Sequence, residues 1–82
     1  MESSNYIPID CNFYDELEAL ATLREQAHII YRNENEEETS VTDLIRDFYI
    51  RDKAEFMLLA SGQSIRLDRL IRVNDKVVPK TC

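Results

Sequence analysis

The spacing of the apolar residues changes along this chain from a helical period to a period of two, and that change limits the folds open to it. Phe13, Leu17, Leu20 and Ala21 fall at i, i+4, i+7 and i+8, which places them on one face of a helix. This pattern predicts a helix over residues 12–25. From residue 27 onward apolar and polar residues alternate, which is typical of half-buried strands.

Short strands separated by turn residues account for the rest of the chain. Residues 45–52 fit either a continuing bent strand or an irregular turn. The alternation slips between Leu67 and Leu70, which suggests a bulge or a bend. Gly62, the only glycine, supports a tight turn with Ser61 because it can adopt a positive φ. The predicted strands are 27–32, 37–44, 55–60, 64–73 and 76–79.

One helix followed by five short strands predicts a mainly β (α+β) fold of one domain, residues 1–82, with residues 1–5 mobile. We expect a small, strongly bent five-stranded antiparallel sheet behind the N-terminal helix. Such a sheet closes most simply as a barrel, because closure removes exposed strand edges. The pattern alone leaves Sm-like, SH3-like and OB-like barrels open.

The charges are unevenly distributed. Residues 1–43 contain eleven acidic and two basic residues, a net charge of −9, whereas residues 44–82 contain five acidic and eight basic residues, a net charge of +3. Phosphate contacts dominate nucleic-acid affinity, so the first half should repel a nucleic acid and attract a basic protein surface.

The two cysteines, Cys11 and Cys82, lie near opposite ends of the chain. A small disulfide scaffold normally has four or more cysteines, so we predict that Cys11 is a small buried hydrophobe without a disulfide. The N-terminus has no apolar run after a basic segment, and no stretch approaches the ~20 apolar residues of a membrane span. We therefore expect a cytoplasmic protein.

Residues 6–18 combine acidic residues, two tyrosines and a cysteine and lead into the predicted helix. Asp10 or Asn12 is a suitable N-cap, and Asp15 and Glu16 would then lie in the first turn, where the helix dipole favours negative charge. No histidine, glycine-rich loop or metal-ligand spacing accompanies them. The segment therefore predicts a docking surface, with no enzyme activity, no metal and no cofactor.

The same segment resembles the start of the Rho-binding antiterminator (Rof) family, through the pattern Tyr6-x-Pro8-Ile9-x-Cys11-x-x-Tyr14-Asp15-x-Leu17-Glu18. A second segment, Ile65-Arg66-Leu67-Asp68-Arg69-Leu70, resembles a late strand of that family. The resemblance covers roughly residues 6–78. It implies an Sm-like barrel and a bacterial, monomeric inhibitor of transcription termination. Such an inhibitor binds the N-terminal RNA-binding domain of Rho and keeps RNA off the primary site.

The resemblance also implies which residues contact Rho. Asp15 and Glu18 match the acidic helix start directly, and Asp10 and Glu16 are their neighbours. Asn12 and Phe13 occupy positions where many relatives have acidic residues. Tyr14 fits equally well as a core residue or as an interface anchor, whereas Tyr6 is expected to pack on the barrel. The predicted partner-binding residues are Asp10, Asn12, Tyr14, Asp15, Glu16 and Glu18.

Other polar features have simpler explanations. Residues 34–38 are an acidic run that predicts a solvated turn. The single histidine, His28, lies on the surface of a predicted strand. Arg66, Arg69 and Arg72 are expected to form surface ion pairs with Asp68 and with the acidic half of the chain, because Asp68 interrupts the set, aromatic stacking partners are absent and the net charge opposes RNA. The alternative function is an Sm-like module that binds RNA directly. The leading interpretation instead predicts no direct contact with nucleic acid.

Overall fold

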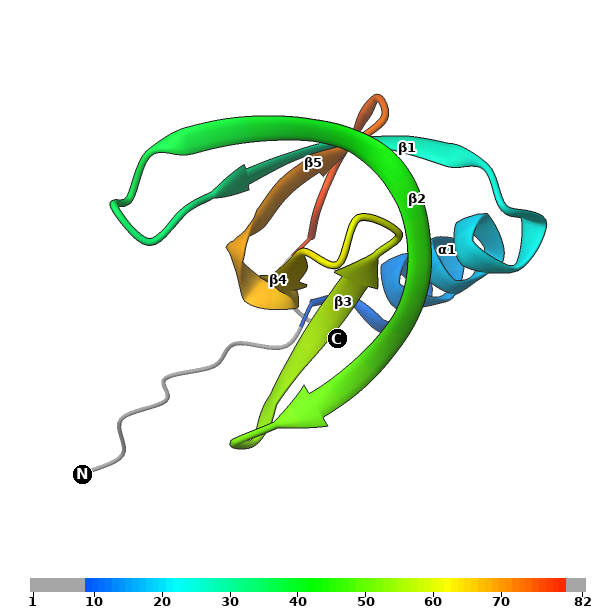
Figure 1. The fold of residues 1–82 in the computed structure, drawn as a ribbon, viewed down its shortest axis with the longest axis horizontal. Coiled ribbons are helices and arrows are strands. Elements are labelled where there is room, and N and C mark those ends of the chain that lie inside the picture. The colour runs from blue at the N-terminus through cyan, green and yellow to red at the C-terminus, as the bar shows by residue number, and fades with distance from the viewer. Residues whose placement is uncertain (1–8, 80–82) are drawn as a thin grey trace.

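A computed structural model describes residues 9–79 of the 82-residue chain (Figure 1). A helix precedes six strands, which form one antiparallel sheet in the order β4-β3-β2-β1-β5-β6. The predicted mobile segment 1–5 and the predicted packing of Tyr6 lie outside the described residues. The elements are α1 (Cys11–Leu23), β1 (Gln26–Arg32), β2 (Glu38–Arg51), β3 (Ala54–Leu59), β4 (Ser64–Arg66), the 3-10 helix η1 (Leu67–Arg69), β5 (Leu70–Val73) and β6 (Lys76–Val77).

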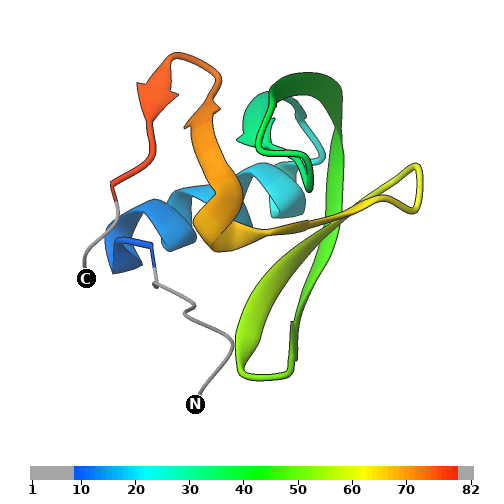
Figure 2. The same cartoon turned by 90° about the vertical axis from the view of Figure 1, so that its left-hand side faces the viewer.

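The sheet is strongly bent but open, so the predicted closed, five-stranded barrel is wrong in strand number and in closure. The arc of β2 in Figure 1 shows the bend. The end strands of the described sheet are β4 and β6, and they do not pair with each other. Instead, β4 runs through η1 directly into β5, as Figure 2 shows, so the two halves of the sheet are joined by the chain itself. β6 then occupies the outer edge of β5.

β2 is a single strand that belongs to both halves of the sheet. Its first half pairs with β1, from Arg32↔Glu38 to Gln26↔Leu44, and its second half pairs with β3, starting at Ile45↔Leu59. The register shifts between Ile45 and Asp47. Of the two alternatives for residues 45–52, the continuing bent strand is therefore correct.

The slip between Leu67 and Leu70 is a bend formed by a turn of 3-10 helix, so of the two predicted alternatives the bend is correct and the bulge is not. Leu67 and Leu70 are both fully buried, since the three-residue turn of η1 brings both side chains to the same side. The tight turn at residues 61–62 is present, and Gly62 has φ +100°, a conformation that other residues rarely adopt.

Helix α1 starts one residue earlier than predicted and ends two residues earlier. Asp10 is the N-cap, and its Oδ2 accepts a hydrogen bond from the backbone N–H of Phe13 at 3.1 Å. The helix ends at Leu23, and its C-cap Arg24 adopts the left-handed conformation with φ 57°. Asp15 and Glu16 consequently begin the second turn, so the predicted first-turn position of these two acids is wrong.

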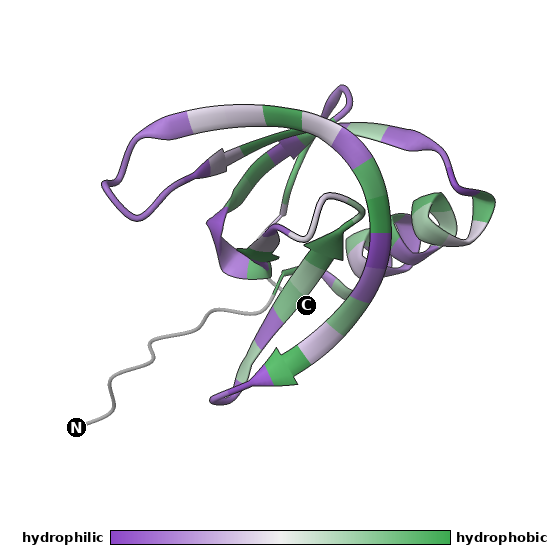
Figure 3. Cartoon of the chain, viewed as in Figure 1, coloured by the Kyte–Doolittle hydropathy of each residue, from purple (hydrophilic) through white to green (hydrophobic). Residues whose placement is uncertain are grey.

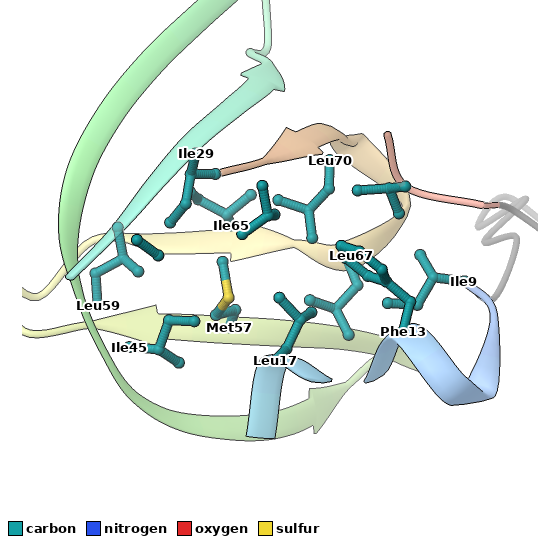
Figure 4. Close-up of a cluster of buried hydrophobic side chains, with 13 residues drawn as sticks. Ile9, Phe13, Leu17, Ile29, Ile45, Met57, Leu59, Ile65, Leu67 and Leu70 are labelled. Carbon is teal, nitrogen blue, oxygen red and sulfur yellow. The ribbon is translucent and has the colours of Figure 1, made fainter. Parts of the chain in front are cut away.

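The core lies between α1 and the concave side of the sheet. Phe13 and Leu17 point from the helix toward Met57, Leu67 and their neighbours (Figure 4). Leu20 and Ala21 pack at its margin, so the predicted apolar face of the helix is confirmed. The largest fully buried side chains are Leu17, Ile29, Met57, Leu59, Leu67 and Leu70.

Both predictions about Cys11 are wrong, because its side chain is exposed and is disulfide-bonded. The only other cysteine in the chain is Cys82, which lies outside the described residues. The physical reason is that the two ends of the domain meet. The backbone N–H of Asp10 donates to the carbonyl of Pro79 at 3.2 Å, a contact that sequence separation does not reveal.

No helix within residues 9–79 is long and apolar enough to cross a membrane.

Candidate docking surface

Helix α1 distributes five of the six predicted contact residues over different sides, and the sixth, Asp10, caps the helix. Successive residues of a helix are rotated by about 100°, so with Phe13 and Leu17 against the sheet, Asp15 faces directly away from the core. Tyr14 and Glu18 lie on the side next to β2, and Asn12 and Glu16 lie on the opposite side, next to β6. The structure therefore does not gather the six residues into one patch.

Tyr14 is half-buried and packs against an aromatic residue of β2. The centroids of the Tyr14 and Phe48 rings are 5.2 Å apart, with an angle of 39° between the ring planes. Both rings also contact the edge of the core. Tyr14 therefore contributes to the core with part of its ring, while the rest remains accessible at the side of the helix.

Three carboxylates surround this tyrosine. Burial raises the pKa of the Tyr14 phenol above its usual 10.0, and the negative charges of Glu55, Glu18 and Asp47 raise it further, in that order. Glu18 comes from α1, Asp47 from β2 and Glu55 from β3. We call Tyr14, Glu18, Asp47, Phe48 and Glu55 the Tyr14 surface.

A cavity of about 450 Å³ adjoins the Tyr14 surface between the helix and β2. Glu18 and Thr22 line it from the helix, and Asp47 and Phe48 line it from the strand. Arg46 also borders the cavity, so the negative potential is partly offset at this edge. A hollow with an aromatic wall and carboxylates at its rim has the chemistry to accept a lysine or arginine side chain.

Sequence reasoning found Tyr14 and Glu18 but missed Asp47 and Glu55. The resemblance of residues 6–18 named the first two, and their i, i+4 spacing puts them on one side of the helix. Asp47 and Glu55 reach the same place only because β2 bends over the helix and β3 pairs beside it. No local sequence signal indicates that proximity.

The remaining predicted contact residues have other surroundings. The carboxylate of Asp10 caps the helix, and Glu16 Oε1 forms a salt bridge of 2.9 Å with Lys76 Nζ of β6. Asn12 and Asp15 are exposed. Of the six predicted contact residues, only Tyr14 and Glu18 therefore belong to the Tyr14 surface.

The acidic turn between β1 and β2 lies far from the Tyr14 surface. In Figure 1 this turn is at the left end of the molecule and α1 at the right end, and Figure 3 colours the turn hydrophilic. The Asn33 side-chain oxygen organises the turn by accepting hydrogen bonds from the N–H groups of Asn35 (2.8 Å) and Glu37 (3.0 Å). The predicted solvated turn is confirmed, and it does not extend the Tyr14 surface.

Among the described residues, Arg66 and Arg69 form the predicted ion pairs, whereas Arg72 forms none. Arg66 forms a two-pronged contact with Asp68, with Nε–Oδ1 at 2.7 Å and Nη2–Oδ2 at 2.8 Å. Arg69 Nη1 contacts Glu36 Oε2 at 3.0 Å. However, the prediction that these arginines have no aromatic neighbours is wrong. Phe56 is the cross-strand partner of Arg66, and both residues line one cavity.

His28 is exposed on β1, as predicted, and its Nδ1 lies 2.9 Å from the Thr42 hydroxyl. Across residues 9–79, no group of three or more histidine, cysteine, aspartate or glutamate side chains could hold a metal ion. No protein-family model matches the chain, and no curated protein matches it significantly.

Proposed function

We propose that this chain is a protein inhibitor of the transcription termination factor Rho, which docks on the N-terminal RNA-binding domain of Rho through the Tyr14 surface. RNA would then be kept from the primary site, and termination would fall. The proposal rests on the resemblance of residues 6–18 and 65–70 to the Rof family and on the charge of the Tyr14 surface. It places the chain in the bacterial cytoplasm as a monomer without a cofactor.

The fold is compatible with the Sm-like domain that this resemblance implies. β1 to β4 follow one another in an antiparallel meander, and β5 returns to pair with β1. We interpret the sheet as an Sm-like arrangement whose ends are joined by η1 instead of by hydrogen bonds.

The observation that carries the proposal is the convergence of carboxylates from three separate elements around one accessible tyrosine. Like charges repel, so such a cluster is unfavourable for the isolated fold. It becomes favourable when a basic partner neutralises it. An RNA-binding site is basic because it must contact phosphates, and carboxylates can occupy the same arginines and lysines.

Charge and burial would contribute to different steps of binding. Exposed Glu18 and Asp47 would accelerate the encounter, and this effect should weaken when salt screens charges over about 8 Å at physiological ionic strength. Tyr14 and Phe48 offer apolar area that is desolvated on contact, which would slow dissociation.

The test is calorimetry of purified Rho with the chain across a salt series, using two variants that change the net charge equally. Glu18→Lys with Asp47→Lys reverses charge on the Tyr14 surface. Glu34→Lys with Glu37→Lys reverses the same charge on the distant β1–β2 turn. We expect the first variant to lose at least about tenfold in affinity, equivalent to about 1.4 kcal/mol, and the second to lose much less.

A thermal melt checks that both variants stay folded, and displacement of labelled cytidine-rich RNA from Rho provides the functional measurement. Absence of wild-type binding at low salt would refute the proposal itself. Equal losses in both variants would show that only net charge matters and that the Tyr14 surface has no specific role.

A further inference from the structure

The outer face of the β2–β3–β4 region contains a row of side chains that the docking surface does not use. Tyr49 of β2 pairs across the sheet with Phe56 of β3, and Phe56 pairs with Arg66 of β4. The neighbouring residues Phe48, Met57 and Ile65 point to the core. Since successive strand residues face opposite sides, the row lies on the face away from the core.

The two rings of this row are stacked. The Tyr49 and Phe56 planes are inclined by only 7° with centroids 5.2 Å apart, and the Tyr49 hydroxyl donates to Ser64 Oγ at 2.8 Å. This hydrogen bond holds the ring across the strands. Tyr49 covers Phe56 on one side, while Phe56 also lines a cavity of about 560 Å³. Because Tyr49 packs on one side of Phe56, the Phe56 ring is held in one orientation and can stack on a ligand from its other side.

Arginines border the same cavity. Arg32 extends from the end of β1 and Arg69 from η1, while Glu34 contributes one negative charge to the lining. Tyr31 also borders the cavity, but its ring packs against the core and its hydroxyl accepts a hydrogen bond from Gln63 Nε2 at 2.7 Å. A neighbouring cavity of about 540 Å³ shares Arg32, Arg66 and Arg69. The two hollows therefore adjoin along η1 and have cationic side chains at their common boundary.

The ion pairs at this boundary differ in how firmly they are held. The Arg66 pair with Asp68 is two-pronged, and the Asp68 side chain is only 11% exposed, which fixes the guanidinium beside Phe56. The Arg69 pair with Glu36 is exposed at 37% and 65%. Exposed pairs of this kind contribute little to stability, so a phosphate can replace the Glu36 carboxylate.

From this arrangement we propose that the outer face binds a single-stranded nucleic acid, with a base stacked on Phe56 and phosphates at Arg32 and Arg69. Rings combined with a cationic groove are the recurring equipment for unpaired strands, because every base has a face that can stack. Our sequence-based expectation of no contact with nucleic acid rested on the net negative charge, on the interruption of the arginines by Asp68 and on the absence of aromatic partners, and the last of these grounds does not hold for the folded chain. The proposal does not depend on binding to Rho.

The test uses the full chain without Rho and fluorescence anisotropy of labelled oligouridine RNA and oligothymidine DNA, each about 10 nucleotides long. We expect the oligonucleotides to bind. The logarithm of the association constant should fall with the logarithm of the salt concentration at a slope of about −1.4, because two phosphate contacts on a single strand contribute about −0.7 each. Stronger binding of the RNA arm than of the DNA arm would show that the ribose hydroxyl is also read.

Two matched variants identify the site. Phe56→Leu removes the stacking ring but keeps an apolar side chain, and we expect it to weaken binding at least about fivefold. Phe13→Leu makes the same change in a buried core residue that belongs to neither surface, and it should leave binding unchanged. Arg69→Ala should reduce the salt slope by about half, to roughly −0.7.

Three results would overturn the proposal. The first is no change in anisotropy for either oligonucleotide at low salt. The second is binding that survives both Phe56→Leu and Arg69→Ala. The third is loss of Rho binding in Phe56→Leu without any oligonucleotide binding by the wild type, which would identify this face as a protein contact.

Discussion

Asp10 is the predicted contact residue whose role the structure changes most, and its replacement separates a structural role from a direct contact. Its Oδ2 accepts a hydrogen bond from the Phe13 N–H, and its own N–H donates to Pro79. The side chain therefore satisfies one of the unpaired N–H groups at the start of α1, and the backbone ties the helix to the end of the sheet. We predict that Asp10 acts through helix stability and not through its charge.

The size of the effect follows from the capping geometry. Loss of an N-cap costs typically about 1 kcal/mol. For a domain of this size, about 1 kcal/mol corresponds to a decrease of about 4–8 °C in melting temperature. Asp10→Ala should show this decrease. Asp10→Asn should retain most of the stability, because asparagine is as good an N-cap as aspartate.

Thermal melts of the two variants, followed by Rho-binding calorimetry, distinguish the roles. We expect Asp10→Asn to bind Rho as the wild type does. If Asp10→Asn melts normally but loses about tenfold in affinity, the carboxylate is a direct contact and the reasoning fails. If Asp10→Ala melts at the wild-type temperature, the cap does not contribute to the stability of α1.

Two further predictions concern the Tyr14 surface and the core beneath it. Glu55→Gln should lower the raised pKa of Tyr14 toward 10.0, because Glu55 makes the largest charge contribution that opposes ionisation of the phenol. Ultraviolet titration against a Tyr14→Phe reference measures this pKa. An unchanged or higher pKa would contradict the proximity of the two groups. Leu17→Ala should lower the free energy of unfolding by about 2–5 kcal/mol in urea denaturation, since Leu17 is fully buried, and a loss below about 1 kcal/mol would show that the core closes around the deletion.

The sequence predicted α1 and most strands because each has a periodic pattern of its own. Phe13 and Leu17 identify the buried side of the helix, and Ala27 and Ile29 identify that of β1. The second half of β2 was ambiguous because Ile45 and Phe48, which both face the core, are three residues apart across the register shift. A shift of this kind interrupts the period of two on which strand prediction depends.

Features that depend on distant parts of the chain were not predictable from local pattern. Closure of the sheet depends on whether its end strands meet, and here η1 joins the halves through the chain. The proximity of Asp47 and Glu55 to Tyr14 depends on the bend of β2. The disulfide of Cys11 depends on the meeting of the two ends near Asp10 and Pro79.

The continuity of β2 has a consequence for how this domain unfolds. Its hydrogen bonds to β1 end at Leu44 and its pairing with β3 begins at Ile45, so adjacent residues of one strand connect the two halves of the sheet. The carbonyl of Leu44 also accepts a hydrogen bond from the Ala60 N–H at 2.9 Å, just beyond β3. Neither half can therefore separate without disturbing the strand that completes the other. The two faces that we assign to different partners should consequently be lost together, in a single cooperative transition.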